Sequence, residues 1–277
     1  MSEPRRELII EAGRTEQQYW RDLWHFRELF YILAWRDLTV RYKQTVIGVA
    51  WAVVRPFLTI VVFTLVFHRV AKLDAPGGLP YALFVSAAMM PWQFFASAFS
   101  EASGSLLSNS GLISKVYFPR LIVPAGSVIT SLVDFAITLG MLAVLMVWYQ
   151  YTPDWRILTL PLFILLAFAA ALGAGLFLCA LNVKYRDFRY IVPFIVQFGL
   201  YVSPVGFGSE RVPQYLRWLY DLNPMVGVIE GFRWACLKGA SSLEARTLAS
   251  SLVVTITLCA FGIWYFRKTE KTFADVI

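Results

Sequence analysis

The sequence predicts an all-α integral membrane protein with six transmembrane helices. Hydrophobic residues make up 58 % of the 277-residue chain and charged residues only 16 %, whereas soluble domains are roughly 45–50 % apolar and about 25 % charged. The apolar residues gather in runs of about 20, the length that a helix needs to cross a hydrocarbon core about 30 Å thick. This composition excludes disordered, collagen-like, coiled-coil and disulfide-rich secreted classes.

Six apolar runs are separated by polar residues, glycines and prolines, which mark their ends to within several residues. We expect transmembrane helices at about residues 46–70, 81–107, 121–149, 157–181, 190–207 and 248–266. Residues 46–277 then form one transmembrane domain, preceded by a cytoplasmic tail and a helix within residues 1–45.

The N-terminal region has two parts. Residues 1–18 are polar and lack the apolar run of a signal peptide, so we expect no cleavable leader. Between residues 20 and 42, tryptophans and other apolar residues recur every three or four positions, with charged residues beside them. This pattern is typical of an amphipathic helix lying in the headgroup plane; the core helix of a soluble amphipathic domain is the alternative.

The distribution of basic residues predicts the orientation. Sixteen of the 25 Lys and Arg residues flank the spans on the side of the two termini, and eight lie on the other side. Because positively charged loops stay in the cytoplasm, we expect both termini there. The net charge of +7 is thereby explained by topology and lipid headgroups, and nucleic acid is not expected as a partner.

The longest connection, residues 208–247, is then on the outer face. Residues 212–220 and 225–237 are amphipathic and aromatic, and Asn223-Pro224 between them is a turn signal. We expect two short re-entrant helices here. Irregular backbone at membrane depth is tolerated only against protein or a water-filled cavity, which hints at a gated opening.

Catalytic and metal-binding patterns are missing from the sequence. It has no GxxxxGK[ST], HExxH or GxSxG motif. Its two histidines stand apart from other ligand residues, and its three cysteines are far apart, so we interpret the cysteines as ordinary buried thiols. Gly173-Ala174-Gly175 lies inside a span and predicts close helix packing. We expect no catalytic residue, metal or cofactor in this chain.

Three ionisable residues, Arg55, Glu101 and Asp134, fall within predicted spans. Each costs roughly 2.5–3.5 kcal/mol at a helix centre, so pairing is the usual arrangement. They indicate either a polar pathway or a lock between Arg55 and one of the carboxylates; alternatively, Glu101 lies near the cytoplasmic interface.

Aromatic residues near the span ends allow two interpretations. They form the belt at the membrane surface, or some of them line a conduit, since sugar rings stack on aromatic faces. From the polar and aromatic residues together, our candidates for a channel lining are Trp51, Arg55, Trp92, Phe94, Asp134 and Tyr201.

Several motifs, in order along nearly the whole chain, resemble those of ABC-2 type permeases, and most closely the branch that exports O-antigen, capsule and teichoic acid. RDLTVRYKQT over residues 36–45, followed by Gly48, Trp51 and Pro56, resembles the start of that family's first membrane helix. KVYFPR over residues 115–120 resembles the segment between its second and third spans. YVSP at 201–204 and LNP at 222–224 fit its fifth span and outer region.

The resemblance implies a homodimer without its own ATPase, served by two copies of a nucleotide-binding subunit that binds ATP and Mg²⁺. It implies a lipid-linked substrate whose phosphate or pyrophosphate meets basic residues at the cytoplasmic rim, here Arg36, Arg41 and Lys43. The resemblance to this family implies no functional role for Arg55. The implied ATPase coupling residues are Ser110, Lys115, Tyr117, Phe118, Pro119 and Arg120. The implied outer-gate residues are Tyr215, Trp218, Asn223, Pro224, Phe232 and Trp234.

The expected function is therefore the permease half of an ATP-driven exporter of lipid-linked polysaccharide, most simply O-antigen, in the bacterial inner membrane. The first alternative is an ABC-2 exporter of drugs or small lipids. The second is a membrane enzyme acting on lipid-linked sugars, which would need paired carboxylates at the membrane surface, whereas Asp187 and Asp221 stand alone.

Overall fold

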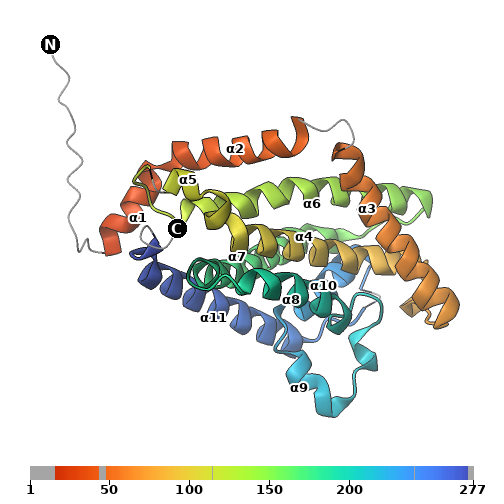
Figure 1. Cartoon of the computed structure of the whole chain (residues 1–277). Helices are drawn as coiled ribbons and strands as arrows, with labels where there is room; N and C mark the ends of the chain where they lie inside the picture. The colour runs from red at the N-terminus through yellow and green to blue at the C-terminus, as the bar shows by residue number, and fades with distance from the viewer. Residues whose placement is uncertain (1–15, 44–47, 114, 240, 274–277) are drawn as a thin grey trace.

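The computed structural model describes residues 16–43, 48–113, 115–239 and 241–273, and these form a bundle of helices (Figure 1). All regular secondary structure within these ranges is helical, which confirms the all-α prediction. Most of the predicted polar tail, and Gln44 and Thr45 of the first motif, lie outside the described residues.

Five segments within the described residues are long and apolar enough to cross a membrane. They consist of α3 (Gly48–Phe63) with the π-helical turn η1 (Thr64–Val70), α4 (Tyr81–Ser108), α6 (Ile122–Trp148), the 3₁₀ turn η3 (Trp155–Thr159) with α7 (Leu160–Lys184), and α11 (Ala245–Glu270). Because the hydrophobic runs determine these lengths, the predicted boundaries are confirmed to within a few residues for all five.

The sixth predicted span, residues 190–207, is only partly helical. Helix α8 (Phe188–Val202) has 15 residues, which gives a length of about 22 Å, less than the core thickness of about 30 Å. It ends at Val202, and the backbone of the next residue, Ser203, is extended because Pro204 disfavours a helical conformation in the residue before it. Six complete spans therefore stay a prediction.

The N-terminal amphipathic helix is divided at Phe26 into α1 (Glu16–His25) and α2 (Arg27–Lys43). Figure 1 shows α2 running alongside α6. A Cβ on Gly126 would lie 4.0 Å from Phe30, and twelve residues further along α2, Tyr42 bonds to Asp134 of α6. Helix α2 thus follows a predicted span, and its last turn is bound to the middle of α6; a position in the headgroup plane stays a prediction.

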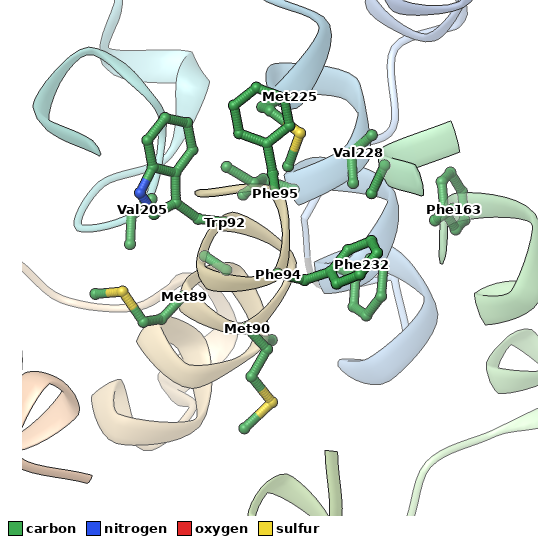
Figure 2. Close-up of a cluster of buried hydrophobic side chains, with 14 of the residues drawn as sticks. Met89, Met90, Trp92, Phe94, Phe95, Phe163, Val205, Met225, Val228 and Phe232 are labelled. Atoms are coloured by element: carbon green, nitrogen blue, oxygen red, sulfur yellow. The ribbon is translucent and has the colours of Figure 1, made fainter. Parts of the chain in front are cut away.

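Helix α4 is the centre of the bundle and contacts α3, α6, α7, α8 and α10 (Pro224–Cys236). Figure 2 shows Phe94 of α4 beside Phe232 of α10, with Phe95 near Met225. Phe135 of α6 completes this aromatic cluster, with ring centroids 5.2 Å from Phe94 and 6.0 Å from Phe232. The apolar core thus joins α4 and α6 to α10, which lies far from both in the sequence.

Glycines let α7 approach two neighbours closely, which confirms the packing role predicted for Gly173-Ala174-Gly175. A Cβ on Gly173 would lie 2.6 Å from the backbone nitrogen of Cys259 in α11, and one on Gly175 would lie 2.7 Å from the Cβ of Ala102 in α4. On the α11 side, a Cβ on Gly262 would lie closer still to the Gly173 carbonyl oxygen. Small residues are the usual means of helix association in lipid, where the hydrophobic effect does not drive helices together.

We expect Gly173→Ala to lower the stability of the purified protein by about 1–3 kcal/mol, because the new methyl group meets helix backbone that cannot move locally. Thermal unfolding in detergent measures this. The matched control is Gly140→Ala in α6, where nothing lies within 4 Å of the new Cβ and the helix gains up to about 1 kcal/mol. Equal unfolding temperatures for the two variants would contradict the close α7–α11 contact.

Candidate functional site

A cavity of about 820 Å³ lies between α2, α3, α4, α6 and α8. Its lining combines aromatic rings, uncharged hydrogen-bonding side chains, two arginines and two carboxylates. Of the six residues predicted to line a channel, five line this cavity: Trp51, Arg55, Trp92, Phe94 and Asp134. The sixth, Tyr201, is outside the lining and 62 % exposed.

A polar clasp formed by Arg41, Tyr42, Glu101 and Asp134 connects α2 to α4 and α6 at this cavity. The Arg41 guanidinium donates through Nη1 to Asp134 Oδ2 at 2.6 Å and through Nη2 to Glu101 Oε1. The Tyr42 hydroxyl donates to the other Asp134 oxygen. One guanidinium thus bridges two helices, because its planar fork presents several donors at once.

Tyr42 takes part in the clasp as a neutral phenol. Burial, followed by the hydrogen bond and the negative charge of Asp134, raises the pKa of Tyr42 to about 12. A raised pKa means that the folded state retains the proton, so this hydrogen bond is present at neutral pH and is lost as the pH rises through about 12.

The predicted lock involving Arg55 is replaced by this clasp. Arg41 holds both carboxylates, while Arg55 has no ion-pair partner in the described ranges and faces the cavity. Glu101 is therefore paired even though its side chain is 46 % exposed. Sequence reasoning missed the pairing because it joins residues 60 and 93 positions apart.

The three residues predicted at the cytoplasmic rim lie at different depths along α2. The Arg36 guanidinium donates to Asp37 and to the Asn109 side chain, just after the end of α4. Arg41 lies beside Asp134, twelve residues into α6, or about 18 Å along its axis. Lys43, the last residue of α2, is exposed.

The predicted coupling segment, which we define as residues 110–120, joins α4 to α6 through the short helix α5 (Ser110–Ile113). Lys115 and Tyr117 are exposed, the latter by 53 %. Phe118 and Pro119 are buried against a second apolar cluster at this end of the bundle. Tyr117 is therefore available for contact, whereas Phe118 packs inward and holds the segment in place.

Both ends of the described chain support the coupling segment. The Glu270 carboxylate, at the end of α11, accepts from the Arg120 backbone N–H at 2.8 Å and from the Tyr19 hydroxyl of α1 at 3.0 Å. The Arg120 guanidinium donates to the Glu270 carbonyl. Burial, reinforced by Glu270, raises the pKa of Tyr19 above its usual range. No short-range signal pointed to Tyr19 or Glu270.

The predicted outer-gate residues lie in three places. Tyr215 and Trp218 are exposed. Phe232 is fully buried in the core, and Trp234 is in edge-to-face contact with Trp155. Asn223 and Pro224 begin α10, where the Asn223 side chain accepts from the Met225 N–H at 3.0 Å. Eleven of the 13 residues of α10 are buried, so this helix is inserted into the bundle.

Arg233 of α10 binds the irregular backbone that follows α8. From the sequence alone, it counted only among the basic residues of the outer side. It is fully buried and donates to the carbonyls of Val205 at 2.8 Å, Phe207 at 2.9 Å and Phe84 at 3.3 Å. Its guanidinium also lies 3.6 Å from the Phe84 ring centroid. These contacts hold the irregular backbone after α8 against α4.

No group of three or more His, Cys, Asp or Glu residues within the described residues is arranged to hold a metal ion. A bundle of apolar helices around a cavity lined by polar and aromatic groups is compatible with a membrane protein that has an internal polar pathway. The family model of ABC-2 type transporters matches residues 28–237. The chain belongs to this family, which confirms the resemblance inferred from its motifs.

The chain is similar to named relatives over most of its length. It is 27 % identical over 260 residues to the O-antigen export system permease protein RfbA of Klebsiella pneumoniae, covering 92 % of this chain and 97 % of the relative. Identity to the protein of the same name from Myxococcus xanthus is 26 %, with 93 % and 98 % covered. Identity to the polysialic acid transport protein KpsM of Escherichia coli is 22 %, with 85 % and 91 % covered.

We expect a double-mutant cycle between Arg41→Ala and Asp134→Ala to give a coupling energy of about 1–2 kcal/mol in the unfolding of the purified protein, because the two charges are in direct contact. The matched cycle between Arg55→Ala and Asp134→Ala should give a value near zero. A larger coupling for Arg55 than for Arg41 would mean that the sequence-based lock, and not the observed clasp, is the stable pairing.

Proposed function

We propose that this chain is the permease half of an ATP-driven exporter that moves a lipid-linked polysaccharide, with O-antigen as the leading candidate, from the cytoplasm across the inner membrane. The observation that carries the proposal is the lining of the cavity, in a chain similar over more than 90 % of its length to permeases named for O-antigen export.

The lining has the chemistry that a carbohydrate needs. Trp51 presents an exposed aromatic ring, the largely buried rings of Trp92 and Phe94 form part of the wall, and Gln93 and Gln197 present amides that both donate and accept hydrogen bonds. Sugar rings have apolar C–H faces and hydroxyl edges, so they match such a mixture. Neutral hydrogen-bonding groups also allow a polymer to move, since no single contact is strong enough to hold it.

We infer that two copies of the chain form the complete channel. The cavity is bordered by α3 and α8, whose outward faces are apolar and carry exposed rings such as Phe57, Phe194 and Phe198. A second copy meeting these faces would enclose the cavity between two permeases. Within such a dimer, the buried helix α10 and the exposed Tyr215 and Trp218 would form the re-entrant outer gate.

The source of energy is a separate subunit. We propose that two copies of an ABC nucleotide-binding subunit, carrying ATP and Mg²⁺, bind the coupling segment through exposed groups such as Lys115 and Tyr117. The contact between Tyr19 and Glu270 keeps α1 and the end of α11 at the same end of the bundle. This agrees with both termini lying in the cytoplasm, beside that subunit.

Purification of the tagged chain from its native membranes in mild detergent tests the proposal. We expect an ATPase subunit in equimolar amount together with bound glycolipid, because the permease has to contact both. An ATPase with bound small lipids or drugs and no glycan would favour the other ABC-2 function. A chain without an ATPase that transfers sugars would show that it is a membrane enzyme.

We expect Tyr117→Ala to reduce ATPase binding and ATPase stimulation by fivefold or more with little effect on thermal stability, because the ring is exposed on the coupling segment. Phe118→Ala should instead lower the stability, by about 3 kcal/mol, since it removes a buried ring. Tyr185→Ala, an exposed tyrosine between α7 and α8, is the matched control. Normal stimulation in Tyr117→Ala would count against this segment as the coupling element.

A further inference from the structure

The charged side chains that line the cavity differ in whether another described residue binds them. Glu101 and Asp134 are both bound by Arg41, and Asp134 is also bound by Tyr42. Arg55 lines the same cavity and has no hydrogen bond or ion pair from its guanidinium within the described residues. The two carboxylates are thus bound to a residue of α2. Arg55 is the exposed positive charge that lines the cavity.

The position of Arg55 makes an unpaired charge unusual. It lies seven residues after the start of α3, about 10 Å along a segment with a mean hydropathy of 2.0. Ionisable groups within membrane spans are costly and almost always face the protein interior or a water-filled cavity, where they pair or mark the pathway of a substrate or ion. An arginine with a cavity in front of it and no partner among the described residues is therefore expected to meet an anion.

The surrounding groups favour a phosphate. The guanidinium fork matches two oxygens of a phosphate bidentately. Gln93, Ser97 and Gln197 line the cavity with Arg55 and offer neutral donors. The Trp51 side chain, one helical turn before Arg55, offers an indole N–H and an apolar ring. The carboxylates, which would repel an anion, are held by the clasp.

We propose that Arg55 binds the phosphate or pyrophosphate of a lipid-borne ligand inside the cavity. This site lies beyond the rim residue Arg36, and it rests on the proposed function for its substrate, the lipid-linked glycan. The phosphate of an ordinary anionic phospholipid offers the same chemistry, so the experiment has to distinguish the two sources.

The test measures binding of tritiated geranylgeranyl pyrophosphate to the purified full-length permease in detergent. Arg55→Gln should weaken binding by tenfold or more, the factor expected when a charge-assisted hydrogen bond to an anion is lost. Arg55→Lys, which keeps the charge but loses the fork, should weaken it by a smaller factor. Arg69→Gln is the matched control, because Arg69 is exposed near the end of η1, outside the cavity, and should bind as the wild type does.

Competition identifies the source of the phosphate. Displacement by unlabelled pyrophosphate lipid alone supports binding of the substrate lipid, and displacement also by phosphatidylglycerol supports binding of any lipid phosphate; the Arg55 site stands in both cases. Equal affinity of wild type and Arg55→Gln, with equal elution volumes and unfolding temperatures, would overturn the site. Arg55→Lys provides the same comparison if Arg55→Gln does not fold.

Failure of this site is distinguishable from failure of the proposed function. Unchanged pyrophosphate binding in Arg55→Gln, together with normal glycan export in cells, would reject the site and keep the exporter. Absence of a co-purifying ATPase and glycolipid from the wild-type chain would reject the exporter, whatever the result for Arg55.

Discussion

A hydrocarbon environment offers no hydrogen-bond partners, so each polar group within the bundle has to find its partner in the protein or in a water-filled cavity. Two arginines show what this constraint produces. Arg233 donates to three backbone carbonyls and thereby fixes the irregular chain after α8. Arg41 bridges Glu101 and Asp134 and thereby fixes α2 along α6. These contacts help to hold the backbone after α8 against α4 and the α2 wall of the cavity in place.

Helix α4 lies between closely packed helices and the cavity. The helices pack closely at the glycine contact between α7 and α11 and around the aromatic cluster of Phe94, Phe135 and Phe232, in which Phe94 and Phe135 also form part of the cavity wall. On the other side of α4 and α6, helices α3 and α8 leave about 820 Å³ open.

The end of the bundle that carries both ends of the described chain also holds the predicted coupling segment. Glu270 holds Arg120 of the coupling segment and Tyr19 of α1 at once, and α1 continues into α2, which forms a wall of the cavity. A displacement of the coupling segment would therefore act on α2 and α11 together. This arrangement is compatible with the ABC-2 family to which the chain belongs.

The sequence by itself determined the membrane class, the family and the extents of five spans, because these depend on local hydrophobic runs, ordered motifs and the thickness of the bilayer. It also located the start of α10, since Asn223-Pro224 is a local capping signal. Only the tertiary structure decided that Arg41, and not Arg55, binds Asp134, that Phe118 is buried beside the exposed Tyr117, and that α2 runs along α6. These features depend on contacts between residues far apart in the chain, and hydrophobic periodicity carries no information about which faces of two helices meet.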